Sequence, residues 1–219
     1  MRFWLLVTIV AGFGLGSTAQ QAENPPAKAP VEEGAANDTG LFRAGAAKLE
    51  ITPKPGAPLN GFGDRQGKGA TGVHDPLWVR CLCLDDSKTR VFLLNADLCA
   101  ITPELREAVL ASLPADISRD NVILTSTHTH NGPGGMSRSL VFRQVSGRYM
   151  PELVDEVAKK FAQVIRMAVE ASKPALVGYG TGTQDNLSRN RRHDDGPVDP
   201  QVGVIRIDDA QKKPIAIVT

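Results

Sequence analysis

The chain has 219 residues, 42% hydrophobic and 22% charged, with 25 basic and 24 acidic residues and a net charge of +1. These values exclude a wholly disordered protein and allow one domain, or two small ones, with a sizeable core. Because there is no basic excess, we expect neither nucleic acid nor a polybasic membrane contact as a partner.

An export signal is predicted at the N-terminus. Arg2 is followed by an apolar run over residues 3–16 and by small residues at 17–19, which is typical of a signal peptide with its cleavage site. The run is shorter than the ~20 residues of a membrane span. We therefore predict a signal peptide over 1–19, no stable transmembrane segment after its cleavage, and export to a periplasm or out of the cell. A non-cleaved anchor or a buried helix is the alternative.

The segment after the signal peptide is predicted to be a disordered linker. Residues 20–41 are rich in Ala, Pro, Glu and Gly and show no periodicity. A single domain is expected over 42–219, and a short strand over 47–52 should open it. A Gly- and Pro-rich loop follows over 53–76, and loops of this length in compact domains are usually functional or disordered.

A hairpin and a strand–helix–strand unit come next. The runs 79–84 and 90–96 are rich in β-forming residues, and a short polar segment joins them. Thr102 then precedes Pro103, a pattern typical of a helix N-cap followed by the first helical residue. The chain returns in a Val-Ile-Leu strand over 121–127. This spacing predicts two parallel strands in a βαβ unit.

A second helix is expected over 152–172. Its apolar residues follow helical spacing and should form one buried stripe, namely Leu153, Val157, Phe161, Val164 and Ala168. Further strands are predicted at 175–180, 202–207 and 214–219. The predicted class is therefore α/β, with a mixed β-sheet, flanking helices and at least one βαβ unit. The chain stops inside an apolar, strand-like run, so we expect a fragment of a longer protein.

The chain has three cysteines, Cys81, Cys83 and Cys99. Cys81 and Cys83 lie two apart on a predicted strand, so they point the same way and cannot easily bond each other. No CxxC pair is present, so a cysteine zinc site is not expected, and we interpret the cysteines as small buried side chains. A disulfide involving Cys99 stays open in an oxidising compartment.

Two of the four histidines are candidates for chemistry. His128 and His130 directly follow a predicted strand, and residues two apart in an extended segment point the same way. Sites in open α/β sheets form beyond the carboxyl ends of parallel strands, and a Gly-rich loop over 131–135 follows. Asp97 ends the neighbouring strand and is expected nearby, as a metal ligand or as an acceptor that fixes an imidazole tautomer. Structural histidines with local hydrogen bonds are the alternative.

Other polar candidates are less informative. His74 and His193 lie in loops, and we interpret them as solvated residues. A basic cluster over 189–192 is either solvated surface or the source of an arginine that stabilises a developing oxyanion. No Ser or Cys nucleophile motif and no P-loop occurs in the sequence.

The segment from Asn121 to Gly135 resembles the signature of the neutral/alkaline, non-lysosomal ceramidases. That signature is a hydrophobic strand followed by Thr-His-Thr-His-Ser-Gly-Pro-Ala/Gly-Gly, and Asn131 stands here in place of the Ser. The resemblance covers about residues 43–219. It includes an opening strand at 44–52, a Leu-Met-Gly-Tyr-Gly-like loop at 59–63, a strand entry at 75–80, and the Asn190-Arg191 pair, which Arg192 rather than Ser follows.

This resemblance implies a zinc-dependent hydrolase of the ceramide amide bond. It implies that His128 is a zinc ligand, that His130 faces the substrate, and that Arg191 lies beside the oxygen bound to the metal. The stretch at Leu59 is implied to approach a Ca²⁺ or Mg²⁺ ion. The family's other zinc ligands, a His in a His-Pro pair, a Glu and a Tyr, lie downstream of Thr219. The resemblance therefore implies a partial catalytic domain, and we expect this fragment to bind zinc weakly and to lack amidase activity.

Two other functions are compatible with the sequence. One is a related metallohydrolase that acts on another amide or ester. The other is a non-catalytic secreted binding domain on the same scaffold. The expected substrate is a lipid-like amide, with ceramide implied by the resemblance, but the low aromatic content of 5% gives no view of a lipid pocket.

Overall fold

The computed structural model describes residues 42–65, 68–185 and 187–219, so the predicted signal peptide and linker lie outside the described residues. The strands are β1 (Arg43–Glu50), β2 (Trp78–Asp85), β3 (Arg90–Ala96), β4 (Val122–Ser126), β5 (Lys173–Thr183), β6 (Gln201–Asp209) and β7 (Pro214–Val218). The helices are α1 (Pro103–Ala111), α2 (Leu140–Ser146) and α3 (Pro151–Glu170), with 3₁₀ turns η1 (Gly63–Arg65) and η2 (Arg119–Asn121).

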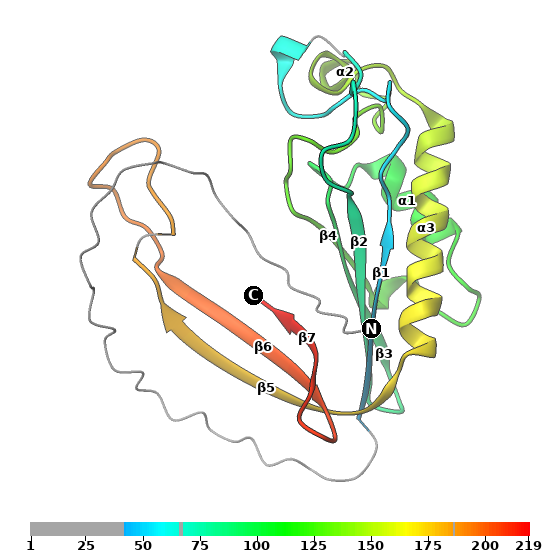
Figure 1. The fold of residues 1–219 in the computed structure, drawn as a ribbon, viewed down its shortest axis with the longest axis vertical. Helices are drawn as coiled ribbons and strands as arrows, with labels where there is room; N and C mark the ends of the chain where they lie inside the picture. The colour runs from blue at the N-terminus through cyan, green and yellow to red at the C-terminus, as the bar shows by residue number, and fades with distance from the viewer. Residues whose placement is uncertain (1–41, 66–67, 186) are drawn as a thin grey trace.

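The strands form one mixed sheet in the order β4-β3-β2-β1-β5-β6-β7. Helices α1 and α3 cover one face of its first half, whereas α2 lies at one end of the molecule (Figure 1). The predicted α/β class with a mixed sheet is confirmed. Helix α2 was not predicted, since its seven residues are too few to show a clear helical period.

The predicted hairpin and βαβ unit are both present. Strands β2 and β3 pair antiparallel along their length, from Val79 opposite Ala96 to Asp85 opposite Arg90. Strand β4 pairs parallel with β3, and α1 forms the connection between them. Strand β1 begins at Arg43, earlier than predicted, because all eight of its residues pair with β2. The sequence did not show this start because Ala and Gly have low strand propensity.

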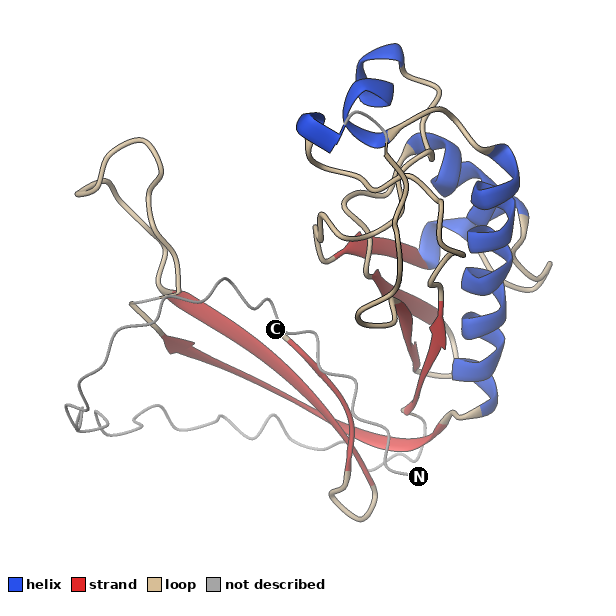
Figure 2. Ribbon diagram, turned by 45° about the horizontal axis from the view of Figure 1, so that its top comes forward, coloured by secondary structure: helices blue, strands red, loops and turns tan. Residues whose placement is uncertain are grey.

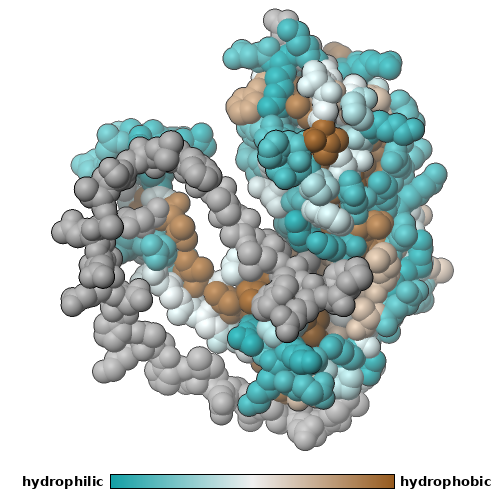
Figure 3. Space-filling view, viewed as in Figure 1, coloured by the Kyte–Doolittle hydropathy of each residue, from teal (hydrophilic) through white to brown (hydrophobic). Residues whose placement is uncertain are grey.

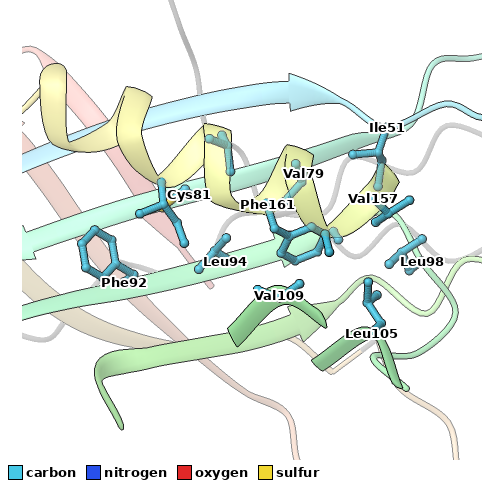
Figure 4. Close-up of a cluster of buried hydrophobic side chains, with 14 of the residues drawn as sticks. Ile51, Val79, Cys81, Phe92, Leu94, Leu98, Leu105, Val109, Val157 and Phe161 are labelled. Atoms are coloured by element: carbon cyan, nitrogen blue, oxygen red, sulfur yellow. The ribbon is translucent and has the colours of Figure 1, made fainter. Parts of the chain in front are cut away.

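The main core lies between α3 and the sheet. Every residue of the predicted stripe on α3 is buried, and Phe161 is fully enclosed by β2, β3 and α1 (Figure 4). Burial of each large apolar side chain contributes roughly 1.5–3 kcal/mol, so this layer holds the strands and their ends in place. No helix among the described residues combines the length and the apolar character needed to cross a membrane.

The three cysteines are free and buried, as the sequence interpretation held. Cys81 and Cys83 belong to the core beside α3. Burial raises the pKa of Cys83 to about 11, so its thiol keeps its proton at neutral pH. Neither residue is placed for chemistry.

Strands β5, β6 and β7 form an arm that bends away from the rest of the sheet (Figures 1 and 2). Strand β5 pairs with β1 only at Arg43–Pro174 and Ala44–Lys173, and then pairs with β6 along its length. A second apolar cluster joins the base of the arm to the sheet face opposite α3. The three strands were predicted, but their direction in space was not.

Thr102 links the start of α1 to the loop that carries the histidines. Its side chain accepts a hydrogen bond from Leu105 N at 3.2 Å and donates one to the Met136 carbonyl at 2.7 Å, and the residue is buried. Replacement Thr102→Val keeps the shape but removes both bonds. We expect it to lower the free energy of unfolding by about 2 kcal/mol in urea denaturation.

The matched control is Ser139→Ala. Ser139 caps α2 from an exposed position with a 3.5 Å bond to Phe142 N. We expect a loss of about 0.5 kcal/mol or less there. Equal losses in the two variants would show that burial of the Thr102 bonds is unimportant.

Candidate metal centre

The candidate site forms where two parallel strands end side by side. Ala96 at the end of β3 lies opposite Ser126 at the end of β4. Thr127 N then donates a hydrogen bond of 3.0 Å to the Ala96 carbonyl, which keeps the two chain segments together beyond the sheet. The segments 97–101 and 127–135 therefore leave the same sheet edge, the position expected for a site in this fold class.

His128 is held in a defined orientation and tautomer. Its φ angle is +60°, an uncommon value for a non-glycine residue and one often found at functional sites. Its Nδ1 lies 2.7 Å from the Cys99 carbonyl oxygen. Because a carbonyl only accepts, Nδ1 must carry the proton and donate it. The Nε2 lone pair is then available for a metal ion, the arrangement usual for metal-binding histidines.

Cys99, His128 and His130 bring three potential ligand atoms within 4.8 Å of one another. Among the described residues this is the one cluster of that kind. The two imidazole rings meet edge to face with centroids 5.0 Å apart. Cys99 is buried, His130 is half-buried and His128 is exposed, so the cluster runs from the interior to the surface. Burial raises the pKa of the Cys99 thiol, so a metal ion must displace its proton to bind the sulfur.

Sequence reasoning brought the histidines together correctly but overlooked Cys99 as a partner. The sequence does carry a signal for Cys99, which lies three residues past the end of β3, as His128 lies two residues past the end of β4. The same rule on strand ends would have identified it. A CxxC pattern is no guide to this cysteine, because its neighbours in the cluster are histidines from another loop.

A second loop supports His130 from behind. The Phe62 ring meets the His130 ring edge to face with centroids 4.6 Å apart. Arg65 donates one hydrogen bond to the His130 carbonyl and another, 3.1 Å long, to Asn131 Oδ1. Gly61 has φ +102°, and a Cβ placed there would lie 2.3 Å from the His130 ring. His130 is therefore fixed by close packing and by a backbone hydrogen bond.

Leu59 lies beside the histidine loop. It forms an isolated antiparallel bridge with Pro133, and Asn60 N donates a 3.1 Å hydrogen bond to the Gly132 carbonyl. Gly134 N donates to the Pro58 carbonyl at 2.6 Å. The backbone thus places Leu59 next to the histidine loop, a contact that the sequence did not predict. No carboxylate cluster for Ca²⁺ or Mg²⁺ occurs there among the residues described, and the ion near Leu59 stays a prediction.

Asp97 lies at the predicted strand end, but its carboxylate contacts β2. One oxygen accepts a hydrogen bond from Trp78 N at 2.9 Å, and the other pairs with Arg80 at 3.0 Å. The acceptor that orients His128 is instead the Cys99 carbonyl. Where β3 ends, its antiparallel partner β2 supplies a backbone donor, Trp78 N, and a cation, Arg80, and the Asp97 carboxylate therefore pairs with β2.

Arg191 is not brought to the histidines. It is exposed in the loop over 187–200, which lies at the free end of the arm, apart from α2 and η1 (Figures 1 and 2). His193 is exposed in the same loop, and His74 forms an exposed ion pair with Asp75 at 2.7 Å. None of the described contacts of Arg191, His193 or His74 involves a residue of the Cys99–His128–His130 cluster.

The donor set of the cluster suits a borderline-soft divalent ion. One sulfur and two imidazole nitrogens are among the ligands that Zn²⁺ prefers, and three protein ligands with an open position are typical of catalytic zinc sites. Thr127 Oγ1, next to His128 in the chain, is buried without a hydrogen-bond partner among the described residues. The residues present therefore fit a metal ion.

Comparisons with known proteins identify relatives of this chain. The profile of the family described as "Neutral/alkaline non-lysosomal ceramidase, N-terminal" matches residues 42–216. The neutral ceramidase of Pseudomonas aeruginosa is 28% identical over 77% of the chain, and neutral ceramidase A of Dictyostelium discoideum is 28% identical over 84%. The crystal structure of the Pseudomonas aeruginosa neutral ceramidase superimposes with a TM-score of 0.72 at 28% identity, covering 81% of this chain.

These relatives are much longer than the described domain. The matched region is 28% of the length of each of the two curated relatives and 31% of the solved chain. The chain thus spans less than a third of the proteins that it matches. A second solved structure, described as ceramidase complexed with C2, gives a TM-score of 0.70 with similar coverage.

Proposed function

Because the chain belongs to the neutral/alkaline non-lysosomal ceramidase family, we propose that it forms the N-terminal part of an exported, zinc-dependent hydrolase of a lipid amide. The observation that carries the proposal is the Cys99–His128–His130 cluster at the ends of β3 and β4. The substrate proposed is a ceramide, cleaved to a sphingoid base and a fatty acid. The names of the matched proteins support this substrate class.

We assign His128 as the main metal ligand. Its Nδ1–H is engaged by the Cys99 carbonyl, so the Nε2 atom is the one that binds the ion. Cys99 and His130 are near enough to complete or support the site. The 219 residues alone are proposed to bind zinc weakly and to be inactive, since three neighbouring donor atoms are the most that the described residues offer in one place.

A bound zinc ion supplies an activated water and polarises the substrate carbonyl. The residues of this chain hold the reacting groups in position. His130 lies between Phe62 and His128, half-buried, where its imidazole can donate to an oxygen that gains negative charge. Arg65 keeps the His130 backbone in place, and its guanidinium lies over the Phe62 ring at 4.8 Å from the centroid, so we describe it as a positioning residue.

The substrate class is supported by the surroundings of His130. Phe62 is half exposed, with 52% of its surface accessible, while its ring meets the His130 ring edge to face. An exposed aromatic ring at the site offers contact to an apolar chain next to a polar amide. This arrangement suits a lipid amide better than a charged or highly polar substrate.

Other assignments are proposals without a contact in the described structure. Arg191 is proposed to approach the reacting oxygen only if the arm loop moves or is repositioned in the whole protein. Asp97 is proposed to act as a support for β2 and for the strand end, through Trp78 and Arg80. A Ca²⁺ or Mg²⁺ ion near Leu59 is proposed to depend on backbone carbonyls.

The test is metal-dependent hydrolysis by the whole protein. Chelator treatment is expected to abolish hydrolysis of a fluorescent ceramide, and Zn²⁺ is expected to restore it. Simpler N-acyl amides and esters, assayed in parallel, separate a ceramidase from a related metallohydrolase. Full activity after verified removal of zinc would contradict the metal proposal, and zinc binding without any hydrolysis would favour a binding domain.

A further inference from the structure

The end of the molecule next to the candidate site exposes a run of large apolar side chains. Leu140, Val141 and Phe142 are consecutive in α2, with 75%, 76% and 38% of their surface exposed. Three consecutive exposed apolar residues are unusual on a soluble protein unless they have a function. Phe62, exposed at 52%, belongs to the loop that packs against the same helix.

Helix α2 and residues 61–65, the loop segment that carries Phe62, form one continuous surface. Gly61 N donates a 3.1 Å hydrogen bond to the Val145 carbonyl, and η1 packs on α2. The two segments lie side by side at one end of the molecule in both ribbon views (Figures 1 and 2). Figure 3 shows apolar surface among polar surface at this end. We call Phe62, Leu140, Val141 and Phe142 the apolar tip.

The charges around the apolar tip are mostly of one sign. Arg138, Arg143 and Arg148 are exposed, and residues 137–150 contain no Asp or Glu. None of these three guanidinium groups forms an ion pair with a described residue; Arg138 instead lies over the Tyr149 ring at 5.3 Å. Two acidic residues lie nearby, Asp64 in η1 and Glu104, whose carboxylate accepts a 2.7 Å hydrogen bond from Arg138 N. The local charge is therefore positive on a chain that is almost neutral overall.

We propose that the apolar tip and its arginines dock the protein on a lipid bilayer that carries anionic headgroups. Large apolar side chains enter the boundary between headgroups and acyl chains, and neighbouring arginines contact the phosphates. Phe62 links this surface to the catalytic cluster, because its ring contacts His130. A lipid amide would then enter the site from the bilayer, an inference that rests on the proposed function for the identity of the substrate.

The charge pattern favours a bilayer over another protein surface. A second copy of the chain would place the three arginines against the same three arginines if the contact were symmetric. An anionic bilayer neutralises all of them at once. The short length of α2, seven residues, suits contact with the surface of a bilayer and not insertion across it.

The experiment measures co-flotation of the whole protein with vesicles. Vesicles of phosphatidylcholine mixed with phosphatidylglycerol are compared with pure phosphatidylcholine. We expect Leu140→Ser/Val141→Ser to lower binding to the mixed vesicles about tenfold or more, because both side chains lose most of their apolar surface. Arg143→Glu/Arg148→Glu is expected to abolish the preference for anionic vesicles, and added salt should weaken the wild-type preference.

Matched controls are available on other surfaces. Ile123 on the edge strand β4 is 50% exposed, so Ile123→Ser changes a comparable apolar side chain. Arg166 on α3 is exposed, so Arg166→Glu makes a comparable charge reversal elsewhere. Both controls should bind vesicles as the wild type does. Equal losses in the controls, or no vesicle binding by the wild type, would overturn the proposal, as would a tip variant that alters only self-association.

Hydrolysis of a short-chain, water-soluble N-acyl amide separates this proposal from the proposed function. The tip variants should hydrolyse it at the wild-type rate, because Leu140 and Val141 are exposed and are not members of the metal cluster. If the wild type binds vesicles but hydrolyses nothing, the docking surface stands and the catalytic proposal fails. If it hydrolyses the soluble amide but ignores vesicles, the docking proposal fails alone.

Discussion

His128→Asn is expected to reduce kcat/KM of the whole protein by at least about a thousandfold and to remove most of its bound zinc. The change deletes the imidazole whose Nε2 is free to bind the ion, while Nδ1 is held by Cys99. Asn is chosen because it tolerates the left-handed backbone at this position, where φ is +60°. Metal content by mass spectrometry and ceramide hydrolysis are the measurements.

His193→Asn serves as the control for His128→Asn. His193 is an exposed histidine in the loop of the arm, away from the metal cluster. It should keep both zinc and activity. The unfolding transition of His128→Asn should stay close to that of the wild type, because an exposed side chain contributes little to the core. A His128→Asn protein with full zinc content would remove His128 from the ligand set.

Gly61→Ala is expected to lower kcat/KM by about a hundredfold. A methyl group on Gly61 would lie 2.3 Å from Cγ and 2.6 Å from two further atoms of the His130 ring, so the ring must move. Displacement of a catalytic group by about 1 Å costs on the order of a hundredfold in rate. Steady-state kinetics should show the loss mainly in kcat, since the change disturbs the imidazole and adds little to the substrate surface.

Gly56→Ala is the matched control for Gly61→Ala. Gly56 has φ +96°, close to the +102° of Gly61, but a Cβ there would meet nothing within 4 Å. Both variants therefore carry similar backbone strain of about 1 kcal/mol, whereas only Gly61→Ala displaces the His130 ring. Equal losses of activity in the two variants would mean that strain, and not the position of His130, explains the effect.

The sequence predicted most of the fold because its signals are local. The apolar stripe of α3, the N-cap at Thr102 and the two β-rich runs of the hairpin each depend on near neighbours in the chain. Parallel pairing of β3 and β4 followed from a general rule of connection. Helix α2 and the early start of β1 were missed, since seven residues and a run of small side chains carry little periodic signal.

The sequence by itself also placed His128 and His130 at a strand end, because a motif next to a strand is visible in one dimension. The partners of these histidines were decided only by tertiary structure. Cys99, Phe62 and Arg65 reach the cluster from two other loops, and Asp97 turns to β2, where Trp78 and Arg80 bind it. Pairing of strands sets which loops meet and which donors compete for a side chain, and no local pattern along the chain encodes that competition.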